Sequence, residues 1–193
     1  SEIKGKGFRI NTLDAEFEGE VTSIHYNDYT YKNIQLNGNF REKIFNGLLI
    51  SKDPNADFDF NGTVDFTKDI PEMNFISTIN RLNLKELHFT NKQDSGALSS
   101  QIFINITGDD INNLSGQINF DNTLYKTLNK TYKLSSFNIQ MEQYTEDKKI
   151  RLSSEYLNGV LFGRYQLGNL KPAFESMLYS YYPSFFAKPI VSK

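Results

Sequence analysis

One segment carries oxygen ligands at the spacing of a calcium-binding loop. Residues 57–65 place Asp or Asn at most alternate positions and Gly62 at the sixth, as the opening of an EF-hand loop does. That loop needs a bidentate Glu at its twelfth position, where this chain has Lys68. Phe58 and Phe60 alternate with the acids, which is typical of a strand with one polar face. We therefore expect a solvated strand face here and no metal site.

Paired carboxylates and histidines are the other candidates for chemistry. Glu16, Glu18 and Glu20 would stand about 7 Å apart along one face of a strand, a spacing that suits a glycosidase pair. Alternating like charges are also typical of a solvated face or edge, and we favour that interpretation. His25 and His88 stand alone among aromatic and apolar neighbours, which favours packing or surface roles. We expect no catalytic residue, no cofactor and no enzyme activity, because nucleophile and phosphate-binding motifs are also absent from the sequence.

Composition narrows the classes of function further. The chain has 193 residues, enough for one domain with its own core. The absence of cysteine excludes disulfides, a thiol nucleophile and a thiolate metal site. A net charge of -2 gives no electrostatic basis for binding nucleic acid. The first residues lack the apolar segment of a signal peptide, so we expect either a cytosolic protein or a piece of a longer exported one.

Alternation with a period of two is the strongest structural signal. Apolar residues face one side, and acids or amides the other, over many short segments that end in turn sequences such as Asn27-Asp28 and Asp53-Pro54-Asn55. The pattern predicts a mainly β fold, an antiparallel meander of about ten to twelve strands over residues 1–169. Leu84, Leu87 and Phe89 are included among its strand positions.

The end of the chain has a different pattern. Apolar residues from Leu170 to Tyr181 recur at helical spacing, with Pro172 in the first turn and Pro183 after the last. This predicts a short amphipathic helix over residues 170–182 that covers part of the sheet, followed by an extended tail over residues 183–193.

Glycines recur inside the predicted strands, on the apolar side. The unit apolar-x-Gly-x-apolar is repeated around Gly19, Gly38, Gly47, Gly62 and other glycines further along. Glycine weakens a strand, so its repeated use indicates either sharp curvature or room beside large side chains. A curved sheet with Phe and Ile on its concave side would form a groove, whereas the same pattern in a closed sandwich or barrel would mark bulges and corners. The glycines alone leave both possibilities open.

These segments together resemble a known family. The stretch from Gly47 to Phe66, which contains Asp53-Pro54-Asn55 and the alternating run from Phe58, is similar to the TamB (translocation and assembly module) family, in particular the long TamB-like proteins of Bacteroidetes-type bacteria. Residues 31–40, 71–87 and 104–108 fit the same repeated pattern, and the similarity spans about residues 5–182. The resemblance implies an AsmA-like, bridge-type architecture, a long sheet curled into an apolar β-groove.

The resemblance also implies a cellular setting. This chain would be a periplasmic fragment of a cell-envelope protein anchored in the inner membrane. The full-length protein would engage an Omp85-type outer-membrane barrel, and the family is linked to phospholipid transport and outer-membrane biogenesis. The sequence carries neither the anchor nor a recognisable C-terminal domain of such a protein.

The alternation and the resemblance agree on one hypothesis, that lipid acyl chains bind along the apolar face. Each buried methylene would contribute about 0.8 kcal/mol. The positions that we expect to line the groove are Phe17, Phe40, Phe58, Phe60, Val64, Ile104, Ile106, Ile118 and Leu161.

Two alternatives stay open at this point. Free sheet edges could hold an unfolded outer-membrane strand by β-augmentation, as an assembly chaperone would. The same residues could instead pack into a closed β-sandwich with a structural role.

Overall fold

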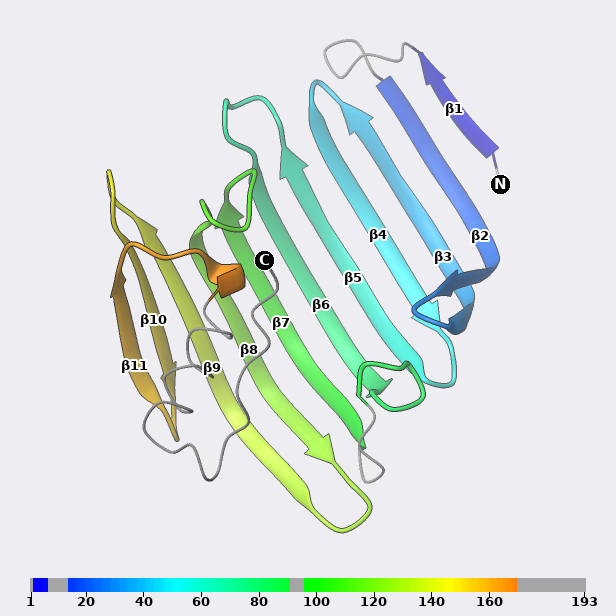
Figure 1. The fold of residues 1–193 in the computed structure, drawn as a ribbon. Coiled ribbons are helices and arrows are strands. Elements are labelled where there is room, and N and C mark those ends of the chain that lie inside the picture. Colours follow the sequence, from blue (N-terminus) through cyan, green and yellow to red (C-terminus); the bar gives the residue numbers. More distant parts are fainter. Residues whose placement is uncertain (1, 7–13, 91–95, 170–193) are drawn as a thin grey trace.

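The computed structural model describes residues 2–6, 14–90 and 96–169 (Figure 1). The helix predicted over residues 170–182 and the tail over residues 183–193 lie outside the described residues, and so does the predicted boundary between sheet and helix. Within the described part, a single helical turn at residues 167–169 is the only helix.

Eleven antiparallel strands form one sheet, and their order in space is their order along the chain. Figure 1 shows them side by side from β1 to β11, with the two outer strands apart, so the sheet is open. This confirms the predicted mainly β meander. The strands are β1 (Glu2–Lys6), β2 (Asp14–Tyr26), β3 (Tyr29–Arg41), β4 (Ile44–Lys52), β5 (Ala56–Asp65), β6 (Glu72–Asn83), β7 (Ala97–Thr107), β8 (Ser115–Lys126), β9 (Thr131–Gln143), β10 (Lys148–Ser154) and β11 (Asn158–Gly163).

The register aligns the apolar positions of successive strands. Residues directly opposite each other in an antiparallel pair lie on the same face of the sheet. One such row runs from β2 to β10 through Phe17, Gly38, Gly47, Gly62, Phe75, Ile104, Ile118, Ile139 and Leu152. We call the side that carries this row the apolar face and the opposite side the polar face.

Three neighbouring glycines in this row make room for phenylalanine rings. A Cβ atom added at Gly38 would lie 2.3 Å from the Phe17 ring, and one added at Gly62 would lie 2.1 Å from the Phe75 ring. At Gly47 the ring of Phe45 would lie 2.5 Å away. The rings therefore lie over the glycines on β3, β4 and β5, and the expectation of room beside large side chains is confirmed there. Gly159 and Gly163 on β11 have nothing within 4 Å of an added Cβ, so this explanation does not extend to them.

Asparagines mark the irregular positions of the sheet. Asn33 and Asn122 adopt positive φ inside β3 and β8, a conformation that Asn tolerates better than most residues. The register also shifts where β5 and β6 pass Asn80, and where β7 and β8 pass Asn122. These positions lie toward one end of the sheet, the end that also carries the turns at Asn27-Asp28 and Asp53-Pro54-Asn55.

One hairpin lacks the turn residues on which the sequence analysis relied. Glu42 and Lys43 join β3 to β4, and both adopt positive φ, 50° and 64°. Asn27 and Asp28 do the same between β2 and β3, with φ of 52° and 58°. Such φ values match the two-residue hairpin turns that favour Asn, Asp and Gly. The turn at Asn27-Asp28 could therefore be predicted from the sequence, whereas Glu42-Lys43 contains no residue type that is typical of such a turn.

The ring-over-glycine packing predicts a difference between two glycines. Gly62→Ala would place a methyl group 2.3 Å from the carbonyl oxygen of Asn74 as well as against Phe75, and we expect a loss of about 1–3 kcal/mol in the free energy of unfolding. Gly159→Ala meets open space and should leave stability unchanged or slightly raised. Urea unfolding followed by circular dichroism measures both, and equal losses would contradict this explanation.

Candidate functional site

All nine positions expected to line a groove lie on the apolar face. Phe40, Val64, Ile106 and Leu161 belong to a row that also contains Met141, while Ile104 and Ile118 lie in the row with the glycines. Phe40 is buried, Leu161 is 41% exposed, and the other seven side chains are half-buried. The register thus brings together residues that are up to 144 positions apart in the sequence.

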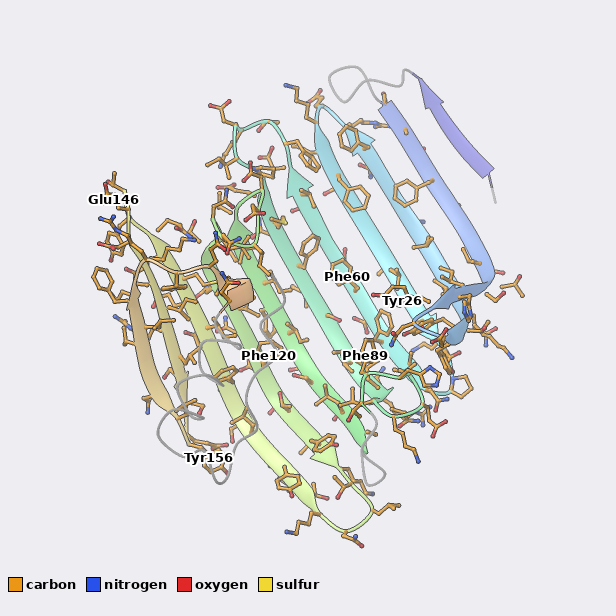
Figure 2. The ribbon with its side chains drawn as sticks, viewed as in Figure 1. Tyr26, Phe60, Phe89, Phe120, Glu146 and Tyr156 are labelled. Carbon is orange, nitrogen blue, oxygen red and sulfur yellow. The ribbon has the colours of Figure 1, made fainter. Side chains whose placement is uncertain are left out.

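Further aromatic residues join these nine on the same face. The Phe17 and Phe45 rings stack with centroids 5.9 Å apart, reaching across the intervening strand β3. Phe60 and Phe75 lie 4.7 Å apart, next to Gly62. Figure 2 shows Phe60 and Phe120 on the viewer's side of the sheet, on strands in its two halves. Phe45, Phe75 and Phe120 were not among the expected lining residues, although alternation placed them on apolar strand faces.

The apolar face remains largely accessible among the described residues. Only Ile34, Phe40, Ala56, Leu87 and Met141 are buried hydrophobic residues in this part of the chain. A closed sandwich would bury most inward-facing residues of two sheets, whereas the described strands form a single open sheet. The described strands therefore offer a broad apolar surface of half-buried Phe, Ile and Leu side chains.

One corner of the apolar face is covered by two connections. The β2–β3 hairpin bends toward the connection between β6 and β7 (Figure 1). Asn27 Nδ2 donates a hydrogen bond to the Leu87 carbonyl oxygen at 3.0 Å, and His88 Nδ1 lies 3.0 Å from the Asn27 carbonyl oxygen. Leu87 is fully buried beneath this contact. The prediction that Leu84, Leu87 and Phe89 lie on strands was wrong, because they form this connection instead.

A buried carboxylate fixes the same corner. Asp53 is 1% exposed and accepts hydrogen bonds from the Tyr29 hydroxyl at 2.6 Å and from the backbone N–H groups of Lys32 and Asn55 at 2.9 and 2.8 Å. Burial, and then the hydrogen bond to Asp53, raise the pKa of Tyr29. Asn83 Nδ2 donates to Asn55 Oδ1 at 2.5 Å, which extends the network to β6. The cluster ties four successive strands together where the hairpin bends.

The carboxylates considered for chemistry lie on the polar face, and several of them form ion pairs or hydrogen bonds. Arg41 bridges Asp14 and Glu16, at 3.0 and 2.5 Å, and Lys52 pairs with Asp57 at 2.9 Å. The hydrogen bond from Lys52 lowers the pKa of Asp57. Residues 57–65 belong to β5, so the oxygen ligands of the calcium-loop pattern alternate along a strand. Within the described residues, no group of three His, Cys, Asp or Glu side chains could hold a metal ion.

The polar face also contains amide pairs and shallow hollows. Asn46 donates to Asn39 at 3.3 Å, and Asn105 and Asn138 donate to the amide oxygens of Asn74 and Asn119 on neighbouring strands. Cavities of about 420 and 400 Å³ lie over β2–β4 and over β5–β8. Their linings combine acids and amides with apolar side chains, including Leu48 and Ile50 in the first cavity and Ile76 and Phe103 in the second.

Comparisons with known protein families, with curated proteins and with solved structures found no match. No helix among the described residues is long and apolar enough to cross a membrane.

Removal of the buried carboxylate tests what holds the covered corner. Asp53→Ala leaves a hydroxyl and two backbone N–H groups without their acceptor, and we expect a loss of about 3 kcal/mol in the free energy of unfolding. Glu18→Ala, on the exposed polar face of β2, should change it by less than about 0.5 kcal/mol. Urea unfolding measures both, and a small effect at Asp53 would show that the network adds little.

Proposed function

We propose that the apolar face binds the acyl chains of phospholipids, as part of a periplasmic cell-envelope protein of the TamB type that carries lipid between membranes and supports outer-membrane biogenesis. The observation that supports this most is the continuity of the apolar rows, which run without a charged residue from β2 to β10 on one face of an open sheet. The family setting rests on the sequence resemblance alone.

The dimensions of the face suit a long apolar ligand. Eight steps between neighbouring strands, each about 4.8 Å, give a row of about 38 Å, longer than a single acyl chain. Each methylene removed from water contributes about 0.8 kcal/mol, so a chain lying along such a row gains affinity from many weak contacts. The headgroup would stay at the rim of the sheet, in water.

The kind of contact favours movement as well as binding. Phe, Ile and Leu side chains attract an alkyl chain without directional bonds. A lipid can therefore shift by one strand while it exchanges old contacts for similar new ones. In the full-length protein, the inner membrane and an Omp85-type outer-membrane barrel would lie at the two ends of this route.

A matched pair of phenylalanines tests lipid binding. Phe60→Glu places a charge on the apolar face, and Phe103→Glu places one on the polar face, where Phe103 is 38% exposed. Purification from bacteria followed by extraction and mass spectrometry should find phospholipid with the native chain and with Phe103→Glu. We expect at least about ten-fold less with Phe60→Glu, because a charge among apolar groups opposes acyl-chain binding.

Circular dichroism of both variants distinguishes a lost ligand from a lost fold. A native protein that carries no lipid, together with a Phe60→Glu variant that unfolds outright, would contradict the proposal and indicate that the apolar face is a closed core. Loss of lipid with a retained strand spectrum supports it.

One observation favours a second candidate, the holding of an extended polypeptide strand. β11 ends the described sheet, and the exposed fractions of Val160, Leu161 and Phe162 are 61%, 41% and 61%. No charged residue occurs from Tyr156 to Gly163, although natural edge strands are usually protected by charge. A strand added at this edge would cover apolar side chains on both faces.

Photo-crosslinking separates the two candidate functions. A photoreactive phenylalanine analogue at position 58 should capture lipid if the apolar face carries acyl chains. The same analogue at position 162 should capture peptide if β11 accepts a strand, and Val160→Lys should then abolish that capture because lysine protects an edge. The control Ile76→Lys, at an exposed position of the interior strand β6, should leave it unchanged.

A further inference from the structure

Exposed apolar side chains gather at one end of the last four strands. The β8–β9 and β10–β11 turns lie at the same end of the antiparallel sheet, and Figure 1 shows both along its lower border. Leu128 is 85% exposed, Tyr156 is 76% exposed, and Tyr132 and Leu157 are each 53% exposed. We call residues 124–133 and 155–157 the β8–β9 tip. Figure 2 shows Tyr156 at this border.

Basic residues surround these side chains. Lys126, Lys130 and Lys133 are all exposed in the tip, and its one acid, Glu155, accepts hydrogen bonds from the backbone and hydroxyl of Ser135 at 2.9 and 3.1 Å. The opposite ends of the same strands carry five acids and three bases over residues 108–114, 142–149 and 164. The tip is therefore the positively charged end of this half of the sheet.

An aromatic cavity connects the tip with the apolar face. The cavity of about 520 Å³ is lined by Tyr125, Tyr132, Leu134 and Tyr156, together with Thr123, Thr131 and Lys133. Tyr125 and Tyr132 stack with ring centroids 6.1 Å apart. Tyr125 lies opposite Leu98 of β7, which in turn lies opposite Leu82 of β6. This row is next to the one that contains the apolar Ile79. The other corner of this end is covered by the β2–β3 hairpin, so among the described residues the uncovered approach to the apolar face from this end lies at the tip.

We propose that the β8–β9 tip docks onto a bilayer surface that contains anionic phospholipid. Tyrosine side chains favour the interface between headgroups and acyl chains, an exposed Leu128 can enter the acyl region, and the lysines attract anionic headgroups. Docking would bring the bilayer to the aromatic cavity and so to the apolar face, and in this respect the inference rests on the proposed function. A second copy of this chain fits less well as the partner, because contact between two tips would place the three lysines of one tip close to the three lysines of the other, and like charges repel.

The absence of tryptophan allows a direct test. Leu128→Trp introduces a single tryptophan at the tip, and Ile111→Trp introduces one at the opposite end, where Ile111 is 59% exposed. Vesicles of phosphatidylglycerol and phosphatidylcholine in equal parts should shift the Leu128→Trp emission to shorter wavelength and leave Ile111→Trp unchanged. Pure phosphatidylcholine vesicles should give a much smaller shift.

Charge reversal tests the role of the lysines. In the Leu128→Trp background, Lys130→Glu should weaken partitioning to the anionic vesicles by more than about five-fold, the effect of one lysine near such a surface. Lys68→Glu, at the opposite end of the sheet, should leave it within about two-fold. Sedimentation with the vesicles gives the partition coefficient.

Three results would overturn docking. They are an unchanged Leu128→Trp emission with anionic vesicles, an equal shift for Ile111→Trp, and a shift without vesicles that grows with protein concentration, which would indicate self-association. These outcomes are separable from the lipid-extraction experiment, since Phe60→Glu lies far from the tip in the sheet. If the protein carries lipid but does not dock, only the proposal that the tip binds a bilayer is rejected. If it docks but carries no lipid, only the proposal that the apolar face binds acyl chains is rejected.

Discussion

The register of the antiparallel sheet is the constraint on which the other features depend. Because side chains alternate between faces, a slip of one residue in any strand would move its apolar set to the polar face. The register instead aligns Phe17, Gly38, Gly47, Gly62 and Phe75 in one row. Each ring in this region then meets a glycine on its own or a neighbouring strand, so packing and register reinforce each other. A continuous apolar face is the direct result.

The sequence predicted this face well because alternation is a local signal. The nine expected residues come from six strands, yet all share one face, since each strand was assigned by its own alternation and strand pairing preserves faces. The prediction that failed depended on a contact between residues far apart in the sequence. Leu87 looked like a strand residue, but it is buried by a contact with Asn27, sixty positions away in the sequence. No periodicity within residues 82–89 could report that contact.

Glycine and asparagine have different structural roles in this sheet. Glycines were expected to mark curvature or space, and on β3–β5 they provide space for aromatic rings. Asn33 and Asn122 adopt positive φ inside strands, as Gly116 and Gly163 also do. Asparagine also fills much of the polar face, where amide pairs such as Asn39 and Asn46 span neighbouring strands. Asparagine therefore contributes both to the local backbone conformation and to the polar face.

The buried Asp53 network and the two most exposed large apolar side chains of the described residues, Leu128 and Tyr156, lie in different halves of the sheet. The β2–β6 half has the buried Asp53 network and the Leu87 contact, which connect neighbouring strands. These contacts form between polar groups whose burial is unfavourable unless they are hydrogen-bonded. The β8–β11 half has the stacked Tyr125 and Tyr132, the exposed Leu128 and the uncharged edge of β11. A surface that exchanges lipid or polypeptide has to stay uncovered, which costs stability. In the proposed function, contacts that fix the β2–β6 half would allow the sheet to keep its register while the β8–β11 half stays uncovered.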